Sequence, residues 1–289
     1  MAAIEIMHLR KYYQKSRGLE DASLTVNEGE IFGFVGPNGA GKTTLIRILM
    51  NLIHKSSGDA LIFGENVDGK AKKLNEIIGY LPSETNFYAE MPVKDVLSFF
   101  AETRKIDFDR MNELVQILDL DLTKKVGALS FGNKKKLGII VAMMHRPKLL
   151  ILDEPTTGLD PLMQKKMLDL LKEEQKQGTT IFLSSHDLAE VQEACDRVAL
   201  IKDGKINFVF KMDDLRMSSF KKLLIKPLNQ SLSFPDLTYL GDVANASQYE
   251  YKGNINDLIQ FLSKYRFESI DLRDSTLAEI FLDYYKKEA

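Results

Sequence analysis

The sequence has little that would suit a disulfide scaffold or a polyanion-binding surface. Its 289 residues include a single cysteine, Cys195, so no disulfide can form within the chain, as is usual in a reducing compartment. Cys195 lies in a segment of helical spacing, 188–198, and is expected to be a small buried side chain. Lysine and arginine (39) nearly balance aspartate and glutamate (41), for a formal net charge of -2. This balance argues against a broad basic surface and therefore against nucleic acid as a partner.

Long apolar runs are also missing. No segment approaches the roughly 18 to 20 apolar residues needed to cross a bilayer, and MAAIEIMHLRKYY at the start has no long apolar core after a basic beginning. We therefore expect no transmembrane segment, so that work at a membrane would require another chain to cross it. With 44% hydrophobic residues, the chain can still build one large domain and a small one.

Six short stretches predict strands in the first two thirds of the chain. Apolar and polar residues alternate at 4–9 and 22–26, which predicts antiparallel strands. The other four are continuous apolar runs, as strands buried on both faces require: 31–35, 149–153, 180–185 and 197–201. Because helical sequence separates these runs, we predict an α/β fold, a mainly parallel sheet with helices on its faces.

The stretch between Met91 and about Arg146 has a helical pattern throughout. Apolar residues recur at intervals of three and four in 93–105 and 111–120. We expect an all-helical subdomain, at about 88–146, inserted into the α/β domain.

The pattern weakens towards the C-terminus. A hairpin is predicted at 201–210, with its turn at Asp203-Gly204. Beyond it, strands and helices are expected at 222–226, 249–253, 254–265, 269–273 and 276–287. We predict one domain at 1–215 and a small α+β domain at 216–289 without a catalytic cluster.

The strongest functional motif is GPNGAGKTT, residues 36–44. It satisfies G-x-x-x-x-G-K-[ST] and stands between a predicted strand and a predicted helix, as a phosphate-binding loop requires. Lys42 is expected to reach the β- and γ-phosphates and the Thr43 hydroxyl to ligate Mg²⁺. A glycine-rich turn beside a lysine is the alternative, but it does not explain why every fixed position is present. The candidate nucleotide-binding residues are Gly36, Asn38, Gly39, Ala40, Gly41, Lys42, Thr43 and Thr44.

The second half of a nucleotide site is predicted at LLILDEP, residues 149–155. Asp153 ends a buried strand, where an isolated carboxylate is costly to desolvate, so Mg²⁺ is its expected partner. Glu154 can polarise water against the γ-phosphate, a contribution of about 10² to 10⁴ in rate. An acidic strand cap explains the motif equally well by itself. The presence of a phosphate loop in the same chain favours the catalytic interpretation of Asp153 and Glu154 over a simple strand cap.

A second anion site is predicted at LSFGNKKKLG, residues 129–138. Ser130 and Gly132 stand at the start of a predicted helix, where unpaired N–H groups and the helix dipole attract a phosphate. At least two of the lysines at 134–136 are expected to lie on a solvated helix face. The question is why one chain needs two phosphate sites.

Five motifs in order answer it: the phosphate loop, LSFGN, LLILDEP, TGLDP and SSHDLAE. Over about residues 1–210 the chain resembles the ATPase subunit of an ABC transporter. Its sequence as a whole is similar to those of bacterial exporters of the drug, antibiotic-resistance and lipid group. The resemblance implies a P-loop NTPase of the ABC type that hydrolyses ATP with Mg²⁺. It also implies a dimer with a second ATPase subunit around two ATP molecules, at the cytoplasmic face of the membrane, driving a separate polytopic permease.

The resemblance implies roles for residues outside the phosphate loop. Ser130 and Gly132 would contact the γ-phosphate of ATP held by the second subunit. Asp160, in TGLDP, matches the loop that communicates across the dimer, and His186, in SSHDLAE, matches the histidine that contacts the γ-phosphate.

The aromatic residue that stacks on adenine is matched by Tyr13, in LRKYY. Tyr12 is its rival, because a slip of one residue on a strand reverses the face. Spacing to Gly36 favours Tyr13. Residues 86–96 are expected to help form the groove that receives the permease's coupling helix.

The chain departs from the family pattern in two places. In the signature, Phe131 and Asn133 replace the usual first glycine and glutamine, while Lys136 matches a basic position. Ser83 stands where the family usually has a glutamine that touches Mg²⁺ and the attacking water. Serine is too short for this, so the adjacent Glu84 is a candidate substitute, and both are doubtful metal contacts.

Three other functions were weighed. A soluble ABC-type clamp acting on ribosomes or DNA usually has two ATPase halves or a long coiled coil, and neither is present here. A small-molecule kinase would leave the LSFGN helix and His186 unexplained. A GTPase is disfavoured because NKKK, at 133–136, lacks the aspartate of the guanine-reading N-K-x-D sequence.

Overall fold

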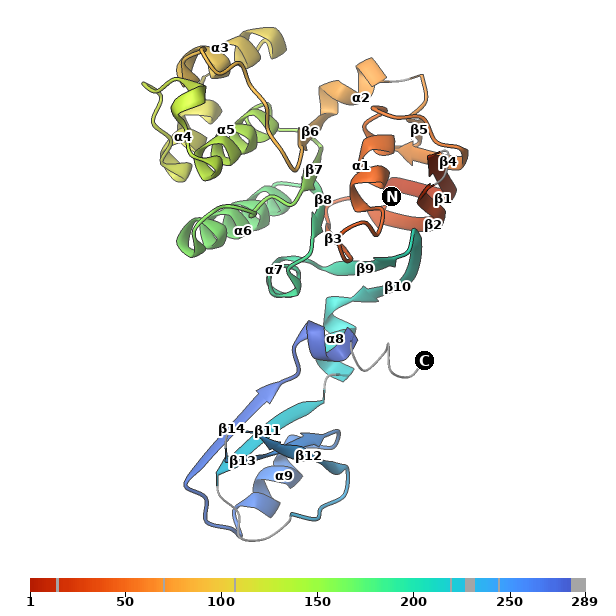
Figure 1. Cartoon of the computed structure of the whole chain (residues 1–289), viewed down its shortest axis with the longest axis vertical. Helices are drawn as coiled ribbons and strands as arrows, with labels where there is room; N and C mark the ends of the chain where they lie inside the picture. The colour runs from red at the N-terminus through yellow and green to blue at the C-terminus, as the bar shows by residue number, and fades with distance from the viewer. Residues whose placement is uncertain are drawn as a thin grey trace. The chain divides into compact units, whose positions relative to one another are not determined.

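The computed structural model describes residues 1–13, 16–69, 71–106, 108–218, 220–226, 232–243 and 245–281. The chain divides into two compact units, Met1–Lys211 and Met212–Ala289 (Figure 1). Among the described residues, none of the helices has the length and apolar character that a membrane crossing needs.

The described part of the first unit contains a ten-stranded sheet with the strand order β5-β4-β1-β2-β10-β9-β3-β8-β7-β6. Its strands are β1 (Ala2–Tyr13), β2 (Ser16–Asn27), β3 (Ile31–Val35), β4 (Ser57–Ile62), β5 (Glu65–Asn66), β6 (Ile78–Leu81), β7 (Leu149–Asp153), β8 (Thr180–Ser185), β9 (Arg197–Lys202) and β10 (Lys205–Lys211).

Parallel pairing runs through one half of this sheet, and antiparallel pairing predominates in the other, where, of the strands that the structure describes, only β10 and β2 pair in parallel. Strands β9, β3, β8, β7 and β6 are parallel neighbours, and β1 pairs with β2 and β4 in antiparallel register. Every residue of β3, β7 and β8 is buried, which fits their continuous apolar sequence. The predicted mainly parallel α/β sheet with an antiparallel part is therefore confirmed, although sequence patterning did not identify β4, β5 and β6.

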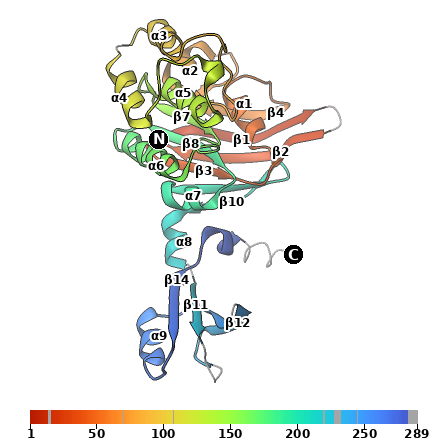
Figure 2. The ribbon, with the colours of Figure 1, turned by 60° about the vertical axis from the view of Figure 1, so that its left-hand side comes forward.

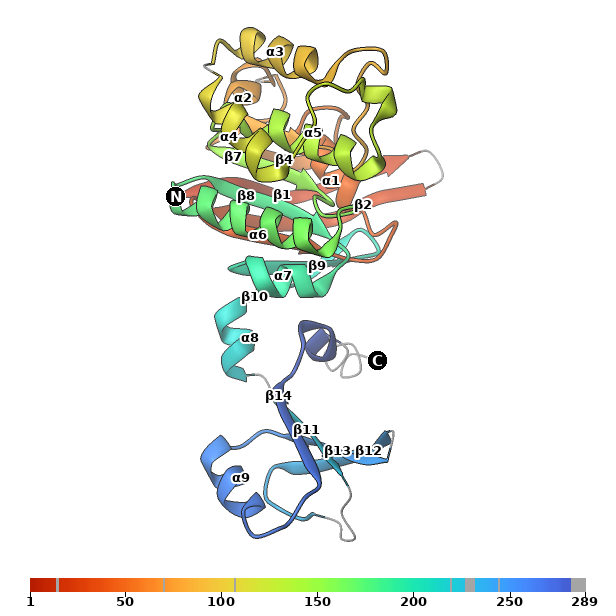
Figure 3. The same cartoon turned by 90° about the vertical axis from the view of Figure 1, so that its left-hand side faces the viewer.

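Helices cover both faces of the parallel strands. Helices α6 and α7 contact β3 and β8 (Figure 3), whereas α1 contacts β2, β4 and β7. Helices α3, α4 and α5 gather at one end of the unit, where α3 and α4 contact α5. The helices are α1 (Lys42–Leu49), α2 (Ala71–Ile77), α3 (Val93–Arg104), α4 (Asp109–Leu118), α5 (Phe131–Met143), α6 (Pro161–Lys176) and α7 (Leu188–Ala194), with a 3₁₀ turn at Val126–Ala128.

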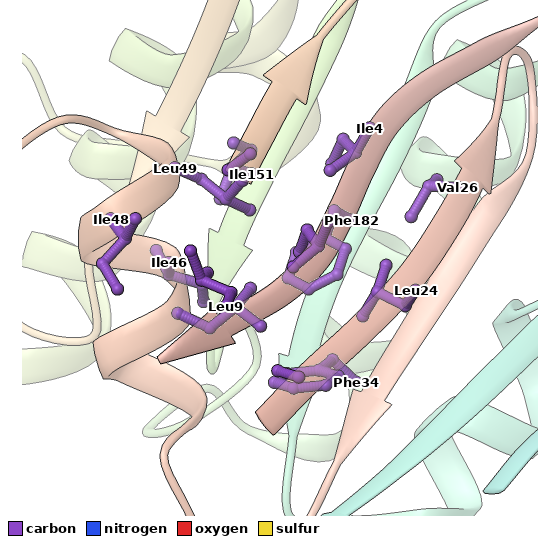
Figure 4. Packing of buried hydrophobic residues seen from close by; sticks show 14 of the residues in the cluster. Ile4, Leu9, Leu24, Val26, Phe34, Ile46, Ile48, Leu49, Ile151 and Phe182 are labelled. Carbon is purple, nitrogen blue, oxygen red and sulfur yellow. The ribbon is translucent and has the colours of Figure 1, made fainter. Parts of the chain in front are cut away.

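The main core fixes the helix that follows the phosphate loop. Figure 4 shows Ile46 and Leu49 of α1 facing Ile151 of β7, with Leu9 of β1 and Phe182 of β8 alongside. All five side chains are at most 1% exposed. Burying each contributes about 1.5–3 kcal/mol, so α1 is held firmly against both halves of the sheet.

The second unit is a small α+β structure. Its four-stranded antiparallel sheet has the order β12-β13-β11-β14, and α9 packs on one face of it (Figure 2). The apolar spacing of α9 matches the predicted helix, whereas β12 was not predicted. Helical structure is described at 277–281, and the rest of the expected final helix lies outside the described residues. The elements are α8 (Met212–Ser218), β11 (Lys221–Lys226), β12 (Leu237–Val243), β13 (Ala246–Tyr251), α9 (Ile255–Leu262) and β14 (Ser269–Asp274).

Candidate functional site

The phosphate loop joins β3 to α1 as predicted, and its glycines are required by geometry. Gly41, the residue before α1, has a φ of 110°. A Cβ atom there would lie 2.5 Å from the carbonyl oxygen of Gly18, so both backbone conformation and space demand glycine. Gly36 likewise lies directly against the backbone of Ile201 in β9. The loop is thus pressed onto β2 and β9.

Lys42 points back into the loop that precedes it. Its Nζ donates to the carbonyl of Gly36 at 2.5 Å and lies 3.6 Å from Oε1 of Glu154. The side chain is buried. The loop lysine and the predicted catalytic carboxylate therefore lie side by side, although they are far apart in the sequence.

Asp153 and Thr43 form the second close pair. The Thr43 hydroxyl donates to Oδ2 of Asp153 at 3.0 Å, and Ser184 donates to Oδ1 at 2.5 Å. Asp153 is 0% exposed. No cluster of three or more His, Cys, Asp or Glu side chains suited to a metal occurs among the described residues. A single carboxylate beside a hydroxyl at a phosphate loop nevertheless fits Mg²⁺, which keeps water and phosphate oxygens in its coordination shell.

Glu154 has an unusual backbone conformation at the end of β7. Its φ is 53°, a left-handed value that costs a non-glycine residue about 1–3 kcal/mol. The bend is held because its N–H donates to the carbonyl of Ser184 at 3.1 Å. As a result, the Glu154 carboxylate turns towards Lys42 on one side and His186 on the other, with Nδ1 of His186 2.7 Å from Oε2.

One cavity of about 330 Å³ brings together Lys42, Thr43 and Glu154, whereas Asp153 and His186 lie outside its lining. Its lining includes the phosphate loop, Tyr13, Gly18, Ser83 and Glu154. Tyr13 packs so closely on Gly18 that a Cβ atom there would lie 2.8 Å from the ring. Tyr12 is not part of the lining. Glu84 is exposed and also lies outside the lining, whereas Ser83 belongs to it.

Ser130, Gly132 and Asp160 form a separate cluster outside this cavity. Ser130 caps α5, its Oγ accepting from the N–H of Asn133 at 3.3 Å, and Asp160 caps α6, accepting from the N–H of Met163 at 3.0 Å. A Cβ atom on Gly132 would lie 2.7 Å from the carbonyl oxygen of Gly158, so the two helix starts are packed together.

Sequence reasoning missed one residue near the site, Lys135. It is 1% exposed, unlike the partly exposed Lys134 and Lys136, so for this lysine a solvated helix face is excluded. Its Nζ donates to the carbonyl of Ser83 at 2.8 Å. The signal was available, because Lys135 has helical spacing to the small and apolar residues at 138, 139 and 142.

An apolar groove of about 540 Å³ lies between the loop after β6 and helix α3. Phe87, Tyr88 and Phe99 are among its lining residues. Tyr88 is 82% exposed and Phe99 58% exposed, which is unusual for large aromatic side chains and indicates a surface suited to a partner.

Comparison with known proteins gives one consistent family. The family model described as ABC transporter matches residues 19–157. The uncharacterized ABC transporter ATP-binding protein YdbJ of Bacillus subtilis (strain 168) is 37% identical over 236 residues, 80% of this chain and 77% of that protein. The bacitracin transport ATP-binding protein BcrA of Bacillus licheniformis is 38% identical over 226 residues, 76% of this chain and 73% of that protein.

Solved structures match the same part of the chain. The ATP-binding subunit of an ABC transporter has a TM-score of 0.69 at 28% identity, covering 74% of this chain and 92% of that one. A dimeric ATP-binding cassette in a post-hydrolysis state, bound to ADP and Pi, has a TM-score of 0.64 at 23% identity, covering 72% and 98%. The second match supports the fold alone.

Proposed function

Because this chain belongs to the ATP-binding proteins of ABC transporters, which are ATPases, we propose that it is the motor subunit of an exporter. In this proposal it dimerises around two ATP molecules and drives a separate permease from the cytoplasmic face of the membrane. The first unit, Met1–Lys211, is the proposed ATPase domain, with a helical subdomain at about 88–146, and the second unit, Met212–Ala289, is an appended domain. The boundary expected at 215/216 falls inside α8, so we propose the domain division at the start of that helix. The observation that carries the proposal is the position of Glu154 between Lys42 and His186 in the phosphate-loop cavity.

The proposed reaction is attack of water on the γ-phosphate, which breaks its bond to the oxygen shared with the β-phosphate and releases ADP and inorganic phosphate. Glu154 accepts the proton of the water, and its strained backbone directs the carboxylate into the cavity. Lys42 stabilises negative charge on the phosphates. An imidazole that carries both protons can donate from Nδ1 to Glu154 and from Nε2 to a phosphate oxygen, which is the role proposed for His186.

Thr43 and Asp153 would hold Mg²⁺, the ion that neutralises phosphate charge when it is bound. Ser83 lines the same cavity and has a hydroxyl that can hydrogen bond to water, whereas the exposed Glu84 is the weaker candidate for metal contact. Tyr13 is proposed to stack on adenine, since its ring forms one wall of the cavity.

Dimerisation explains the cluster around Ser130. Ser130 and Gly132 start α5 outside the cavity that holds Lys42, so a phosphate bound to them is best supplied by a second subunit. Asp160, which caps the adjacent helix, is proposed to relay the state of one site to the other.

The permease is proposed to dock in the groove at Phe87, Tyr88 and Phe99. Export, rather than import, is supported by the resemblance to drug and antibiotic exporters and by a relative that is a bacitracin transport ATP-binding protein. The main alternative is a soluble clamp that acts on ribosomes or DNA.

The deciding experiment is purification of the tagged protein from gently solubilised membranes of its native host. We expect a polytopic membrane protein in about equal amount, together with ATPase activity that requires Mg²⁺. Tyr88→Asp should lose the membrane protein, because it places a charge in the groove, and Tyr239→Asp, at an exposed tyrosine of the second unit, is the matched control. Recovery with ribosomes or DNA instead would establish the clamp.

A further inference from the structure

Helix α5 carries a buried ammonium group behind the loop that lines the nucleotide cavity. We propose that Lys135 is a positioning residue for ATP hydrolysis, holding the Ser83 loop in place and joining it rigidly to the helix that begins at Ser130. The inference rests on the catalytic site proposed above.

Lys135 contacts the backbone of the Ser83 loop directly. Nζ of Lys135 donates to the carbonyl oxygen of Ser83 at 2.8 Å and lies 3.5 Å from that of Pro82. These two residues follow β6, whose last residue, Leu81, pairs with Leu152, the residue before Asp153. The lysine therefore holds the backbone of the loop at the point where it passes the catalytic strand end.

Two further contacts fasten the same loop to α5. The Thr85 hydroxyl donates to the backbone carbonyl of Lys134 at 3.2 Å. A Cβ atom on Gly138 would lie 2.5 Å from Cγ2 of Thr85 and 2.8 Å from Cδ1 of Leu81, so loop and helix touch without a gap. The loop from Pro82 to Thr85 and the first turns of α5 form one packed body.

Electrostatics explains why a lysine is stable in this place. Burial lowers the pKa of Lys135, and the negative charges of Asp153 and Glu154 oppose that effect. A buried ammonium without acceptors would be very costly, so the loop carbonyls and the two carboxylates together retain it. The positive charge thus lies behind the loop, within electrostatic reach of Asp153 and Glu154.

The short side chain of Ser83 makes the position of its backbone important for the cavity. A serine reaches only a short distance from its backbone, so its hydroxyl can contribute to the cavity only where the loop is held close to Glu154. Because the same helix begins at Ser130, a shift of the loop moves the proposed trans phosphate contact as well. Lys135 is therefore the link between the chain's own cavity and its contact with the partner's nucleotide.

The kinetic test uses Lys135→Met, which keeps the length of the side chain but removes the donor. We expect kcat at saturating Mg·ATP to fall by about tenfold or more, with the Kd of a fluorescent ATP analogue unchanged. Lys135→Gln, which retains a neutral donor, should recover part of kcat. Lys166→Met is the matched control, since Lys166 is exposed on α6 and should leave kcat unchanged.

The loop position is tested separately with a thiol probe at Ser83→Cys. Cys195 is buried, and burial raises the pKa of its thiol, so the probe is the reactive cysteine in the folded protein. Adding Lys135→Met should increase the rate of reaction with a thiol reagent by about tenfold, and adding Lys166→Met should not. Equal rates in the two backgrounds would overturn the inference.

Other results of the kinetic test would also decide against the inference. A Lys135→Met protein with wild-type kcat overturns the inference, and so does loss of ATP binding in proportion to activity, because that pattern reports general unfolding. Where the methionine variant does not fold, Lys135→Gln carries both tests. If the wild-type protein hydrolyses no ATP, or Glu154→Gln has full activity, the proposed catalytic site fails rather than the role of Lys135.

Discussion

Nδ1 of His186 lies 2.7 Å from Oε2 of Glu154, although the two residues follow different strands, β8 and β7. The strands are parallel neighbours, so their carboxyl ends meet at one edge of the sheet. That edge also receives Lys42, 3.6 Å from the other oxygen of Glu154. A single carboxylate is thereby held between a cation and an imidazole.

Replacing this carboxylate should separate binding from hydrolysis. Glu154→Gln keeps the size of the side chain and a hydrogen bond to His186 but cannot accept a proton, so kcat should fall by about 10² to 10⁴. Binding of a fluorescent ATP analogue should be retained. Glu102→Gln, at an exposed position on α3, serves as control. Turnover near that of the wild type would assign the base to another residue.

The proposed action of Ser130 in trans can be tested by mixing variants. Ser130→Arg should abolish turnover while the monomer still binds ATP, because Ser130 lies outside the cavity of its own chain. Mixed with Glu154→Gln, it should regain activity, since one of the two sites in a mixed dimer then has both groups intact. If Ser130 served its own chain's site, each site would contain a defect and the mixture would stay inactive.

A buried ion pair joins α4, one of the three helices gathered at one end of the first unit, to α6, which covers the sheet. Arg110 of α4 bonds to Glu174 of α6, and both side chains are nearly fully buried. Arg110→Met leaves the Glu174 carboxylate without its cation and should lower the free energy of unfolding by about 3–5 kcal/mol.

Urea unfolding of two further variants tests whether this loss of stability comes from an unpaired buried charge. The double variant Arg110→Met/Glu174→Leu should be less destabilised than Arg110→Met alone, because no buried charge remains unpaired. Glu113→Gln, which removes the more exposed carboxylate that also contacts Arg110, should cost less than about 1 kcal/mol. Equal losses in the single and double variants would contradict the importance of charge burial.

His145 should make stability depend on pH below neutrality. Burial, with the nearby Arg104 charge, lowers the pKa of His145 to about 4 from its usual 6.5. The unfolded chain therefore binds more protons between these values, and stability present above pH 6.5 is lost progressively as the pH falls towards 4. Because the ring is not fully buried, about 1–3 kcal/mol is expected. The difference in stability between wild type and His145→Gln should narrow from pH 7 to pH 5, and a constant difference would refute this assignment.

The sequence by itself determined the local chemistry of the site. Only glycine fits at Gly41, and only a continuous apolar run can form β3 or β7 within a sheet covered on both faces, so the phosphate loop and the aspartate after LLIL could be located without coordinates. The family was indicated by the order of five motifs along the chain, through their resemblance to those of ABC transporter ATPase subunits.

Only the tertiary structure decided which distant residues meet. The motifs already placed Thr43 and Asp153 at one Mg²⁺ site, but their direct hydrogen bond, and the contact of Lys135 with the Ser83 carbonyl, come only from the fold. Short strands such as β6 were missed because their apolar runs are brief. The sequence did not single out Lys135 among the three lysines, because a lysine is normally solvated unless acceptors lie within its reach. Those acceptors are carbonyls of the Ser83 loop, and they exist at the required place only when helix α5 packs against it.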